Sequence, residues 1–484
     1  MILTKEDYLS RFIPTGAGDK DACDYLNQTL DYAIHNGVSD IHIGVGKTKE
    51  QCRVSFRVNG EVIETKHITP ELAKTIKTKI CSKANINDAV ENVPHDGRMT
   101  FTSGRVADVR VNILPLRYGS NSITCRILDS ANSAVDIDSY RIDALKKYVL
   151  KNAVKQSEGM ILVSGPTGSG KTTTLYSLLN YVYTGKNKIH TIENPVEYIN
   201  HNFYQSEVTH NMSFSMALTA ILRQDPDVIM VGEIRDKASA ETAIKASETG
   251  HILLSTVHAN DSISTITRLT REGVSMDQIS DTLRAVVAQR LIRSIPPDVK
   301  FDWVSPTPIE KKFLIKHGIY FDGMRFPSLP DELLTDRLPI MEIIEINQEL
   351  RDALIEGGGA ITNNILSIVS KQQQFETLTQ SGVRLALQGK TTLDSVRQTM
   401  SDSKPIPLTK RFEQLLVESG SLDIFNLEKA LEIYVENQIN GSDLSLSKIL
   451  LDNQFVTQDA MAAAISQCNY SAAHKKSLVR EVIN

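Results

Sequence analysis

The feature that most constrains this chain is the segment GPTGSGKT at residues 165–172, which fits the pattern G-x-x-x-x-G-K-[S/T] without a mismatch. An apolar run at residues 160–164 leads into it, and a helix-compatible stretch follows at residues 173–183. A strand, a glycine-rich turn and a helix in this order present backbone N–H groups and a helix N-terminus to phosphate. A chance match in a glycine-rich turn would lack these flanks. We therefore predict a phosphate-binding loop.

Each part of this loop has a predicted role. Lys171 reaches the β- and γ-phosphate oxygens, Thr172 binds Mg²⁺, and the glycines permit a close approach that a side chain would block. The predicted nucleotide-binding residues of the loop are Gly165, Pro166, Thr167, Gly168, Ser169, Gly170, Lys171, Thr172 and Thr173. ATP and Mg²⁺ are the predicted cofactors.

Short apolar runs alternate with helical patterns between residues 141 and 300. Residues 160–164, 227–232 and 252–257 are nearly continuous apolar segments, and residues 190–193 form a weaker, more polar one. Strands that are buried on both faces by crossover helices have this composition. The pattern predicts a three-layer α/β domain with a mostly parallel sheet.

Acidic residues and histidines follow several of these predicted strands. Glu233 comes after residues 227–232, which places it at the carboxyl edge of the sheet, where ligands bind in open α/β folds. It is the candidate to activate the attacking water, directly or through the Mg²⁺ shell; a surface acid at a strand end is the alternative. Glu193 and Glu197 follow the weaker strand and could equally form a solvated acidic loop. His251 and His258 flank residues 252–257, and a structural role stays open for both.

The rest of the chain differs from this central region. Residues 20–130 mix one helical stretch, at 25–36, with several alternating strand patterns, as in a small α+β domain. Residues 411–420 and 445–454 form a weak repeat 34 positions apart, and each copy continues into an amphipathic helix. We predict an N-terminal domain at 1–130, a linker at 131–140, the ATPase core at 141–300, a helical extension at 301–400 and a C-terminal helical repeat at 401–484.

Composition excludes several classes of protein. The chain has 53 Lys and Arg against 58 Asp and Glu, which is not the charge of a general nucleic-acid binder. Its apolar stretches fall far short of the ~20 residues that a membrane span requires, and its start resembles no signal peptide, so we expect a cytoplasmic protein. The five cysteines form no C-x-x-C pair, which predicts neither disulfides nor a zinc site.

Several ordered motifs resemble those of the hexameric secretion ATPases that drive type II secretion, type IV pili and some type IV secretion systems. Residues 192–197 resemble the Asp box of that family, and residues 222–236 resemble its Walker B region. Residues 249–261 resemble its His box, and residues 289–291, QRL, the motif that closes its core. The resemblance covers residues 20–400.

The resemblance implies an architecture and further site residues. It implies a RecA-like P-loop core that is preceded by a PAS-like α+β domain and followed by helical domains. Arg110, Arg117 and Arg126 match positions from which such domains lend arginines to the nucleotide. Their positive charge would stabilise the transition state at the γ-phosphate, although solvated arginines are also common on strands. His258 would sense the γ-phosphate, and Glu193 and Glu197 would support Glu233.

The chain also departs from the family. Asn194 stands where the family usually has Asp. No cysteine lies between Cys125 and Cys468, where many assembly motors carry a four-cysteine zinc motif, so the chain is predicted to be zinc-free. The C-terminal repeat resembles a helical domain that usually comes first. Some of those domains bind cyclic di-GMP through Arg-Leu-Gly loops, but here the loops read RFE at 411–413 and SLS at 445–447. We predict docking of a protein partner instead of cyclic di-GMP.

Together these features predict a Mg²⁺-dependent ATPase that forms a homo-hexameric ring. Through a platform protein of the inner membrane, it would power type IV pilus assembly or a related type II/IV secretion system. A nucleotide-gated scaffold of the same machinery with little turnover is the alternative. A DNA-translocating helicase is disfavoured by the acidic charge balance, and no direct binding of nucleic acid is expected.

Overall fold

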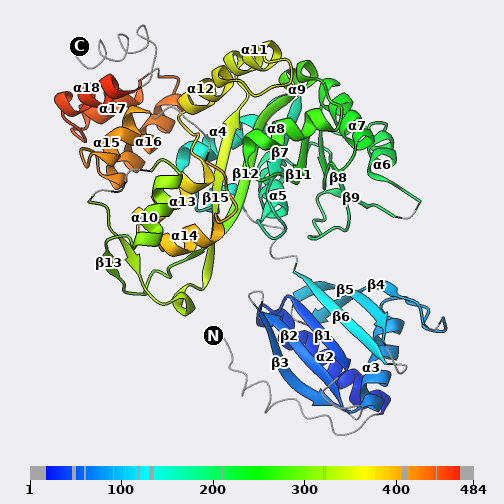
Figure 1. Ribbon diagram of the computed structural model, residues 1–484. Helices are drawn as coiled ribbons and strands as arrows, with labels where there is room; N and C mark the ends of the chain where they lie inside the picture. The colour runs from blue at the N-terminus through cyan, green and yellow to red at the C-terminus, as the bar shows by residue number, and fades with distance from the viewer. Residues whose placement is uncertain are drawn as a thin grey trace. The chain divides into compact units, whose positions relative to one another are not determined.

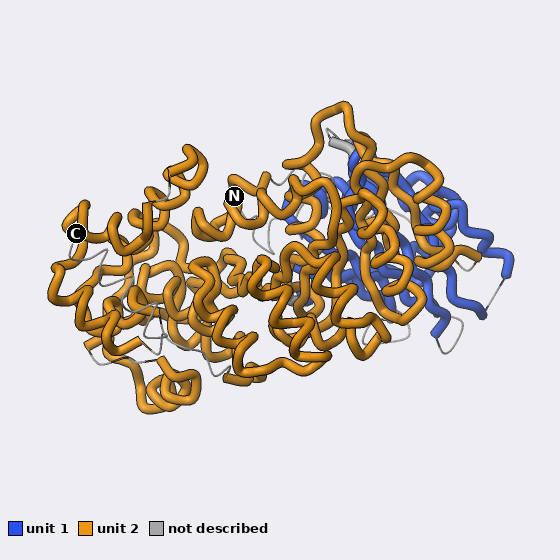
Figure 2. The backbone as a smooth tube through the Cα atoms, turned by 90° about the horizontal axis from the view of Figure 1, so that it is seen from above, with its two compact units in different colours: residues 1–134, 197–200 blue, residues 135–196, 201–484 orange. Residues whose placement is uncertain are grey.

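The computed structural model of the chain (Figure 1) describes residues 18–45, 51–58, 61–90, 92–103, 105–116, 120–129, 136–209, 211–319, 321, 323–405, 411–442 and 444–468. The chain divides into an N-terminal unit, residues 1–134 and 197–200, and a second unit, residues 135–196 and 201–484 (Figure 2). The boundary falls within the segment 131–140. The finer division of residues 141–484 into three domains stays a prediction.

Among its described residues, the N-terminal unit contains one six-stranded antiparallel sheet and two helices. Its strands, in the order β3-β2-β1-β6-β5-β4, are β1 (Asp40–Val45), β2 (Cys52–Val58), β3 (Glu61–Ile68), β4 (His95–Ser103), β5 (Arg105–Pro115) and β6 (Asn121–Asp129). Helices α2 (Asp19–His35) and α3 (Pro70–Lys83) pack together and contribute Leu30, Ile76 and Ile80 to a core with alternate strand residues. The α+β prediction for this region is confirmed.

The second unit is built on a seven-stranded sheet in the order β15-β12-β7-β11-β10-β8-β9. Its strands are β7 (Gly159–Ser164), β8 (Ile189–Glu193), β9 (Tyr204–Glu207), β10 (Val228–Val231), β11 (Ile252–Val257), β12 (Leu283–Ser294) and β15 (Asp336–Glu345). Only the pair β12–β15 is antiparallel among the described neighbours. Strands β7, β8, β10 and β11 are buried along their whole length, which explains their apolar composition. The mostly parallel α/β sheet is confirmed.

Helices cover the sheet of the second unit on both faces (Figure 1). The helices up to residue 399 are α4 (Ala144–Val154), α5 (Lys171–Val182), α6 (Phe214–Ile221), α7 (Lys237–Glu248), α8 (Ser262–Arg271), α9 (Met276–Thr282), α10 (Pro308–Lys316), α11 (Gln348–Glu356), α12 (Asn363–Lys371), α13 (Leu378–Leu387) and α14 (Leu393–Thr399). The helical extension predicted at 301–400 also contains strands, namely β13 (Asp302–Val304), β14 (Phe326–Ser328) and β15. Its description as helical is therefore corrected: β15 pairs with β12 over ten residues and forms the edge of the central sheet.

The C-terminal repeat consists of two helix pairs. Helices α15 (Phe412–Glu418) and α17 (Leu446–Asp452) begin 34 positions apart, and so do α16 (Ile424–Ile439) and α18 (Gln458–Gln467). One apolar cluster joins all four helices. The predicted helical repeat is thus present, and α16 packs against α4 of the same unit.

Arg411 fastens this repeat to the preceding residues. Its side chain is only 4% exposed, and Nη1 donates to the carbonyl oxygens of Gln372 and Phe375, the latter at 2.8 Å. Nε lies 2.5 Å from Oε1 of Glu413, which is also buried.

Among the residues that the structure describes, no helix is long and apolar enough to cross a membrane.

Candidate functional site

The predicted phosphate loop joins β7 to α5, as its sequence requires. Gly165, Gly168 and Gly170 have φ values of +149°, +76° and +84°, a region that favours glycine. A Cβ on Gly165 would lie 2.3 Å from the carbonyl oxygen of Gln289, so no other residue fits there without a shift. Lys171 begins α5, and its Nζ donates to the carbonyl oxygens of Gly165 and Pro166, each at 3.0 Å. This glycine-rich turn before a helix N-terminus suits a phosphate group.

The sheet register brings the other candidates of this unit to the same edge. Ser164, which precedes the loop, pairs with Val257 of β11, and the next residue on that strand end is His258. Val231 of β10 pairs with Ile192 of β8, so Gly232-Glu233 and Glu193 follow neighbouring positions. The loop, Glu233, His258 and Glu193 therefore lie at the carboxyl ends of β7, β10, β11 and β8.

Glu233 is held by two basic side chains. Glu233 is 9% exposed. Its carboxylate forms an ion pair with Arg235 and lies 3.5 Å from Nε2 of His258. Backbone contacts fix the strand end: Gly232 N–H donates to Ile192 O at 2.7 Å and Ile234 N–H to Thr256 O at 3.0 Å. A carboxylate held in place in this way can accept a proton from water. The resulting change in its charge alters its interaction with the neighbouring histidine.

Glu193 differs from Glu233 because it is buried and held by hydroxyl groups. The hydroxyls of Tyr176 and Thr191 both donate to its Oε1 at 2.7 Å, and Tyr176 belongs to α5. Glu193 therefore ties the end of β8 to the helix that follows the phosphate loop. Glu197 is exposed and is grouped, with the rest of Glu197–Asn200, in the N-terminal unit.

The sequence did not assign a role to Gln289, although it lies in a recognised motif. Its side chain is 1% exposed; Nε2 donates to Ser169 O at 2.7 Å, and Oε1 accepts from the Thr174 hydroxyl at 2.7 Å. Gln289 thus fastens the loop backbone and the first turn of α5 to β12. Gln289 follows Ala288, which pairs with Ser164 directly before the loop. This strand register cannot be read from the sequence, so the motif alone did not reveal the role of Gln289.

Five charged residues form a row across the sheet of the N-terminal unit. The strand pairs align Arg57, Asp40, Arg126, Arg110 and Arg98 as successive direct partners. Directly paired residues share a face of an antiparallel sheet, and neighbouring like charges are unfavourable there. The row contains four arginines and one carboxylate, and this excess of positive charge makes the surface suited to binding anions. Arg57 and Arg98 were not among the predicted site residues, and Arg117 lies outside the described residues.

Asp40 is the single acid of this row. Nε of Arg126 donates to its Oδ1 at 2.8 Å, and Nε of Arg57 lies 3.7 Å from Oδ2. Burial by itself raises the pKa of Asp40, but the hydrogen bonds from Arg126 and Ser39 and the Arg126 charge leave that pKa below its ordinary value. Asp40 therefore stays ionised and orients Arg126 within the row.

Glu342 supports the site from β15. Its buried carboxylate accepts from the N–H and hydroxyl of Ser262, which begins α8 after the His258 loop, and from the N–H of Leu378 at 3.2 Å. Burial raises the pKa of Glu342 to about 7, against the effect of these donors. Glu342 thus joins the starts of two helices through one carboxyl group.

We expect stability to respond to the proton on Glu342. Between about pH 4.5 and pH 7 the folded chain retains this proton more than the unfolded chain does, so the free energy of unfolding falls as pH rises. Relative to Glu342→Gln, the wild type should lose on the order of 3 kcal/mol across this window. Urea unfolding from acidic to neutral pH measures this difference, with exposed Glu349→Gln as control. A difference that does not change with pH would refute it.

The described residues contain no group of three or more His, Cys, Asp or Glu side chains that could hold a metal ion. The five cysteines are free in the structure, and all five positions are described. The absence of zinc stays a prediction.

Comparison with known proteins shows to which sequences this chain is similar. Residues 16–398 match the family described as Type II/IV secretion system protein. The type II secretion system protein E of Pectobacterium carotovorum subsp. carotovorum is 35% identical over 376 residues, 77% of this chain and 74% of that protein. The type IV pilus assembly ATPase PilB of Pseudomonas aeruginosa is 35% identical over 398 residues, 80% of this chain and 69% of that protein.

Solved structures have the same fold. The pilus retraction motor PilT with bound ADP superposes with a TM-score of 0.58 at 27% identity, over 79% of this chain and 97% of that chain. The Legionella pneumophila ATPase DotB gives a TM-score of 0.57 at 20% identity, over 81% of this chain and 97% of that chain, and at this identity supports the fold alone.

Proposed function

The chain belongs to the family of type II/IV secretion system proteins, and we propose that it is an ATP-hydrolysing ring motor of such a machine. The observation that carries the proposal is the meeting of the phosphate loop, Glu233 and His258 at one sheet edge. The motor would power type IV pilus assembly or a related type II/IV secretion system. The likeness to PilB and to protein E supports both uses.

In the proposed mechanism the loop holds the triphosphate. Its backbone N–H groups and the N-terminus of α5 face the phosphates, and Lys171 exchanges its carbonyl partners for phosphate oxygens. The Thr172 hydroxyl and, through water, Glu233 would hold Mg²⁺, whose charge would offset that of the β- and γ-phosphates. Gln289 keeps the loop in place because it bonds the carbonyl of Ser169.

Glu233 would orient and activate the attacking water. Its carboxylate is fixed between Arg235 and His258, so it can accept the proton of that water while His258 responds to the γ-phosphate. Glu193 acts indirectly because it is buried and bonded to Tyr176 of the helix that follows the loop. Glu197 supports the same edge in this proposal.

We further propose that arginines of the N-terminal unit complete the site. Arg110 and Arg126, together with Arg117, would lend positive charge to the γ-phosphate, and this charge would stabilise the transition state. The row that contains Arg110 and Arg126 offers the required positive surface. In this view the N-terminal unit is PAS-like, the second unit is RecA-like, and six chains form the ring.

The proposal places the motor in the cytoplasm, at the inner membrane through a platform protein. ATP and Mg²⁺ are its cofactors, zinc is not required, and the C-terminal helical repeat is a docking module at residues 401–484. Arg411, the basic residue of the first repeat loop, is buried in contacts with Gln372 and Phe375. This engagement supports the view that the loop is not a cyclic di-GMP site.

Complementation of a host that lacks this protein tests the proposal. The wild-type chain should restore surface pili or secreted substrates, and Lys171→Ala should restore neither, because it removes the cation that contacts the β- and γ-phosphates. Immunoblots for equal protein levels and the variant Lys245→Ala, at an exposed position of α7, are the controls. Full complementation by Lys171→Ala would argue for the scaffold alternative. The readout that recovers, pili or secretion, identifies the machine.

A further inference from the structure

Glu342 is a buried acidic residue that the proposed mechanism leaves unused. It lies on β15, is 1% exposed, and accepts hydrogen bonds from Ser262, the first residue of α8, and from Leu378, the first residue of α13. A buried carboxyl group is unfavourable unless donors satisfy it, so Glu342 and these two helix starts hold one another in place. Of the two starts, that of α8 leads back to the site, because His258 lies only four residues before it.

The first turn of α8 is fixed from two sides. Ser262 is fully buried and donates both its N–H, at 2.8 Å, and its hydroxyl to Oε1 of Glu342. The hydroxyl of Thr265, also fully buried, donates to the hydroxyl of Ser164 at 2.7 Å. Ser164 ends β7 and directly precedes the phosphate loop. This turn is therefore anchored to the edge strand β15 on one side and to the central strand β7 on the other.

His258 lies between this turn and the end of β11. Residues 259–261 are the only ones that separate it from α8, and Asp261 is the N-cap of the helix. The preceding strand end is held as well, because the Thr256 hydroxyl donates at 2.6 Å to the carbonyl oxygen of the residue before Glu233. A shift of α8 would therefore change the contact between Nε2 of His258 and the Glu233 carboxylate, which are 3.5 Å apart.

We propose that Glu342 is a positioning residue for ATP hydrolysis, because it fixes the first turn of α8 and thereby the place of His258 beside Glu233. The inference rests on the proposed ATPase function, and it adds to that site a residue from the edge strand of the sheet. Loss of the carboxyl group would leave the N–H and the hydroxyl of Ser262 without this acceptor in the core, and α8 would shift to find another.

The phosphate loop should be affected far less than His258. Gln289 donates to Ser169 O at 2.7 Å, and the Ser164 hydroxyl donates to Val287 O at 3.2 Å. Both contacts join the loop region to β12 and do not involve α8. Loss of Glu342 should therefore slow the hydrolytic step while nucleotide affinity persists, which is the signature of an interaction needed in the transition state.

Single-turnover phosphate release and calorimetric titration with Mg-ADP, both on the full chain, test the inference. Glu342→Ala should lower the rate constant of hydrolysis roughly ten- to a hundredfold and change the Kd for ADP less than about threefold. Thr265→Val removes the second anchor of α8 and should act in the same direction. Thr267→Val is the matched control: its hydroxyl donates to a carbonyl oxygen of the same helix, and the rate should not change.

A double-mutant cycle separates positioning from a purely structural effect. If Glu342 acts through His258, Glu342→Ala should slow hydrolysis by less than about twofold in a His258→Ala background. Glu342→Gln should be faster than Glu342→Ala, because its amide oxygen can still accept from Ser262.

Three results would overturn the inference. They are a wild-type rate in both Glu342→Ala and Thr265→Val, a parallel loss of ADP affinity, and an undiminished loss of rate in the His258→Ala background. If Glu342→Ala does not fold, Thr265→Val and Ser262→Ala enter the same cycle and decide in the same way. A wild type that binds ADP but does not hydrolyse ATP would instead count against the proposed function itself.

Discussion

Replacing Glu233 by Gln is expected to leave ATP binding intact and to slow ATP turnover by about two to four orders of magnitude. The amide keeps the size of the side chain but cannot accept the proton of the attacking water. The phosphate loop does not depend on Glu233, because Lys171, the glycine turn and Gln289 hold it independently. Equilibrium binding of ATP and the rate of phosphate release, measured on the same preparation, check both halves of the expectation.

The matched control is Glu241→Gln on α7, an exposed carboxylate that pairs with Lys237 at 3.6 Å. This variant removes one negative charge close to Glu233 in the sequence, and it should retain wild-type turnover. If Glu233→Gln also hydrolysed ATP at the wild-type rate, Glu233 would have no role as base, and one of the other edge residues would have to supply it.

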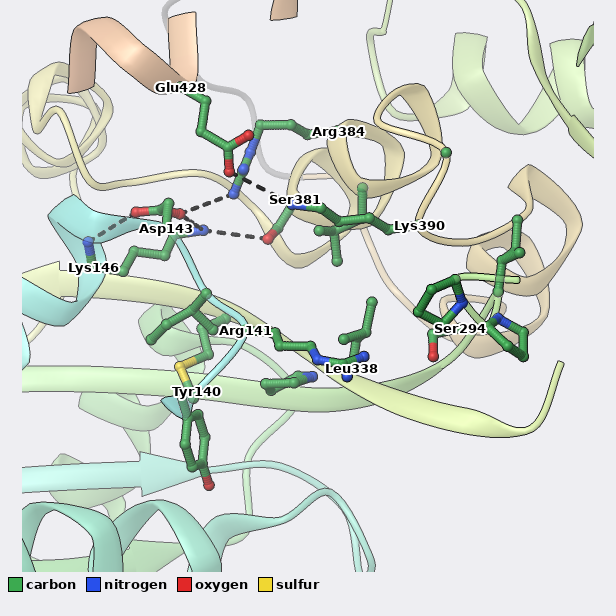
Figure 3. A pocket seen from close by; sticks show the side chains of 18 of the residues that line it. Tyr140, Arg141, Asp143, Lys146, Ser294, Leu338, Ser381, Arg384, Lys390 and Glu428 are labelled. Carbon is green, nitrogen blue, oxygen red and sulfur yellow. Dashed lines mark hydrogen bonds and ion pairs between the residues drawn. The ribbon is translucent and has the colours of Figure 1, made fainter. Parts of the chain in front are cut away.

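Replacing Arg384 by Met is expected to lower the free energy of unfolding of the second unit by about 3–5 kcal/mol. Arg384 lies in a largely buried network with Lys146, Asp143 and Glu376: Nη2 is 2.9 Å from Asp143 (Figure 3), and Nε is 3.1 Å from Glu376. Lys146, 2% exposed, lies 3.1 Å from Glu376 and 3.4 Å from Asp143. Without Arg384, Asp143 and Glu376 would keep Lys146 as their direct ion-pair partner. Denaturant unfolding followed by circular dichroism measures the loss.

The exposed pair Arg397–Asp394 on α14 provides the control. Arg397→Met should cost less than about 1 kcal/mol, because water screens exposed ion pairs. A loss of similar size in both variants would show that the buried network contributes nothing special.

The same network has a defined pH dependence. Burial alone would raise the pKa of Glu376, but the charges of Arg384, Lys146 and Arg411 hold it at about 2, below its ordinary value of 4.5. The stabilisation from Glu376 is therefore complete above about pH 4.5 and is lost as the pH falls towards 2. This acid sensitivity should shrink in Arg384→Met.

Local patterns predicted the core of the second unit well. The apolar runs located β7, β10 and β11, because strands covered on both faces leave few polar positions. Glu233 could be placed because carboxyl ends of parallel strands share one edge. His258 was expected at the end of a neighbouring apolar run with a structural role left open, and only the structure shows the 3.5 Å contact between it and Glu233.

Elements with weak or mixed patterns were missed. Helix α3 buries only Leu72, Ile76, Ile80 and Cys81, so its sequence is largely polar and its mean hydropathy gives little signal. Strand β15 was assigned to a helical region; it contains Pro339 and is recognisable as a strand only through its pairing with β12. Neither error affects the phosphate edge.

Interactions between distant residues were also beyond the sequence. The arginine row depends on the register of β2, β1, β6, β5 and β4, and a shift of one residue would move its side chains to the other face. The Asp143–Arg384 pair joins residues 241 positions apart. Gln289 and Ser169 are 120 positions apart. Such contacts follow from tertiary packing and not from spacing along the chain.

Steady-state phosphate release by the purified full chain, with Mg²⁺ and saturating ATP, is the most direct test of the central claim. The wild type should turn over continuously, and Glu233→Gln should be slower by about two orders of magnitude or more at equal nucleotide occupancy. A wild type that binds ATP but releases phosphate no faster than Glu233→Gln would contradict the motor and identify the chain as a nucleotide-gated scaffold.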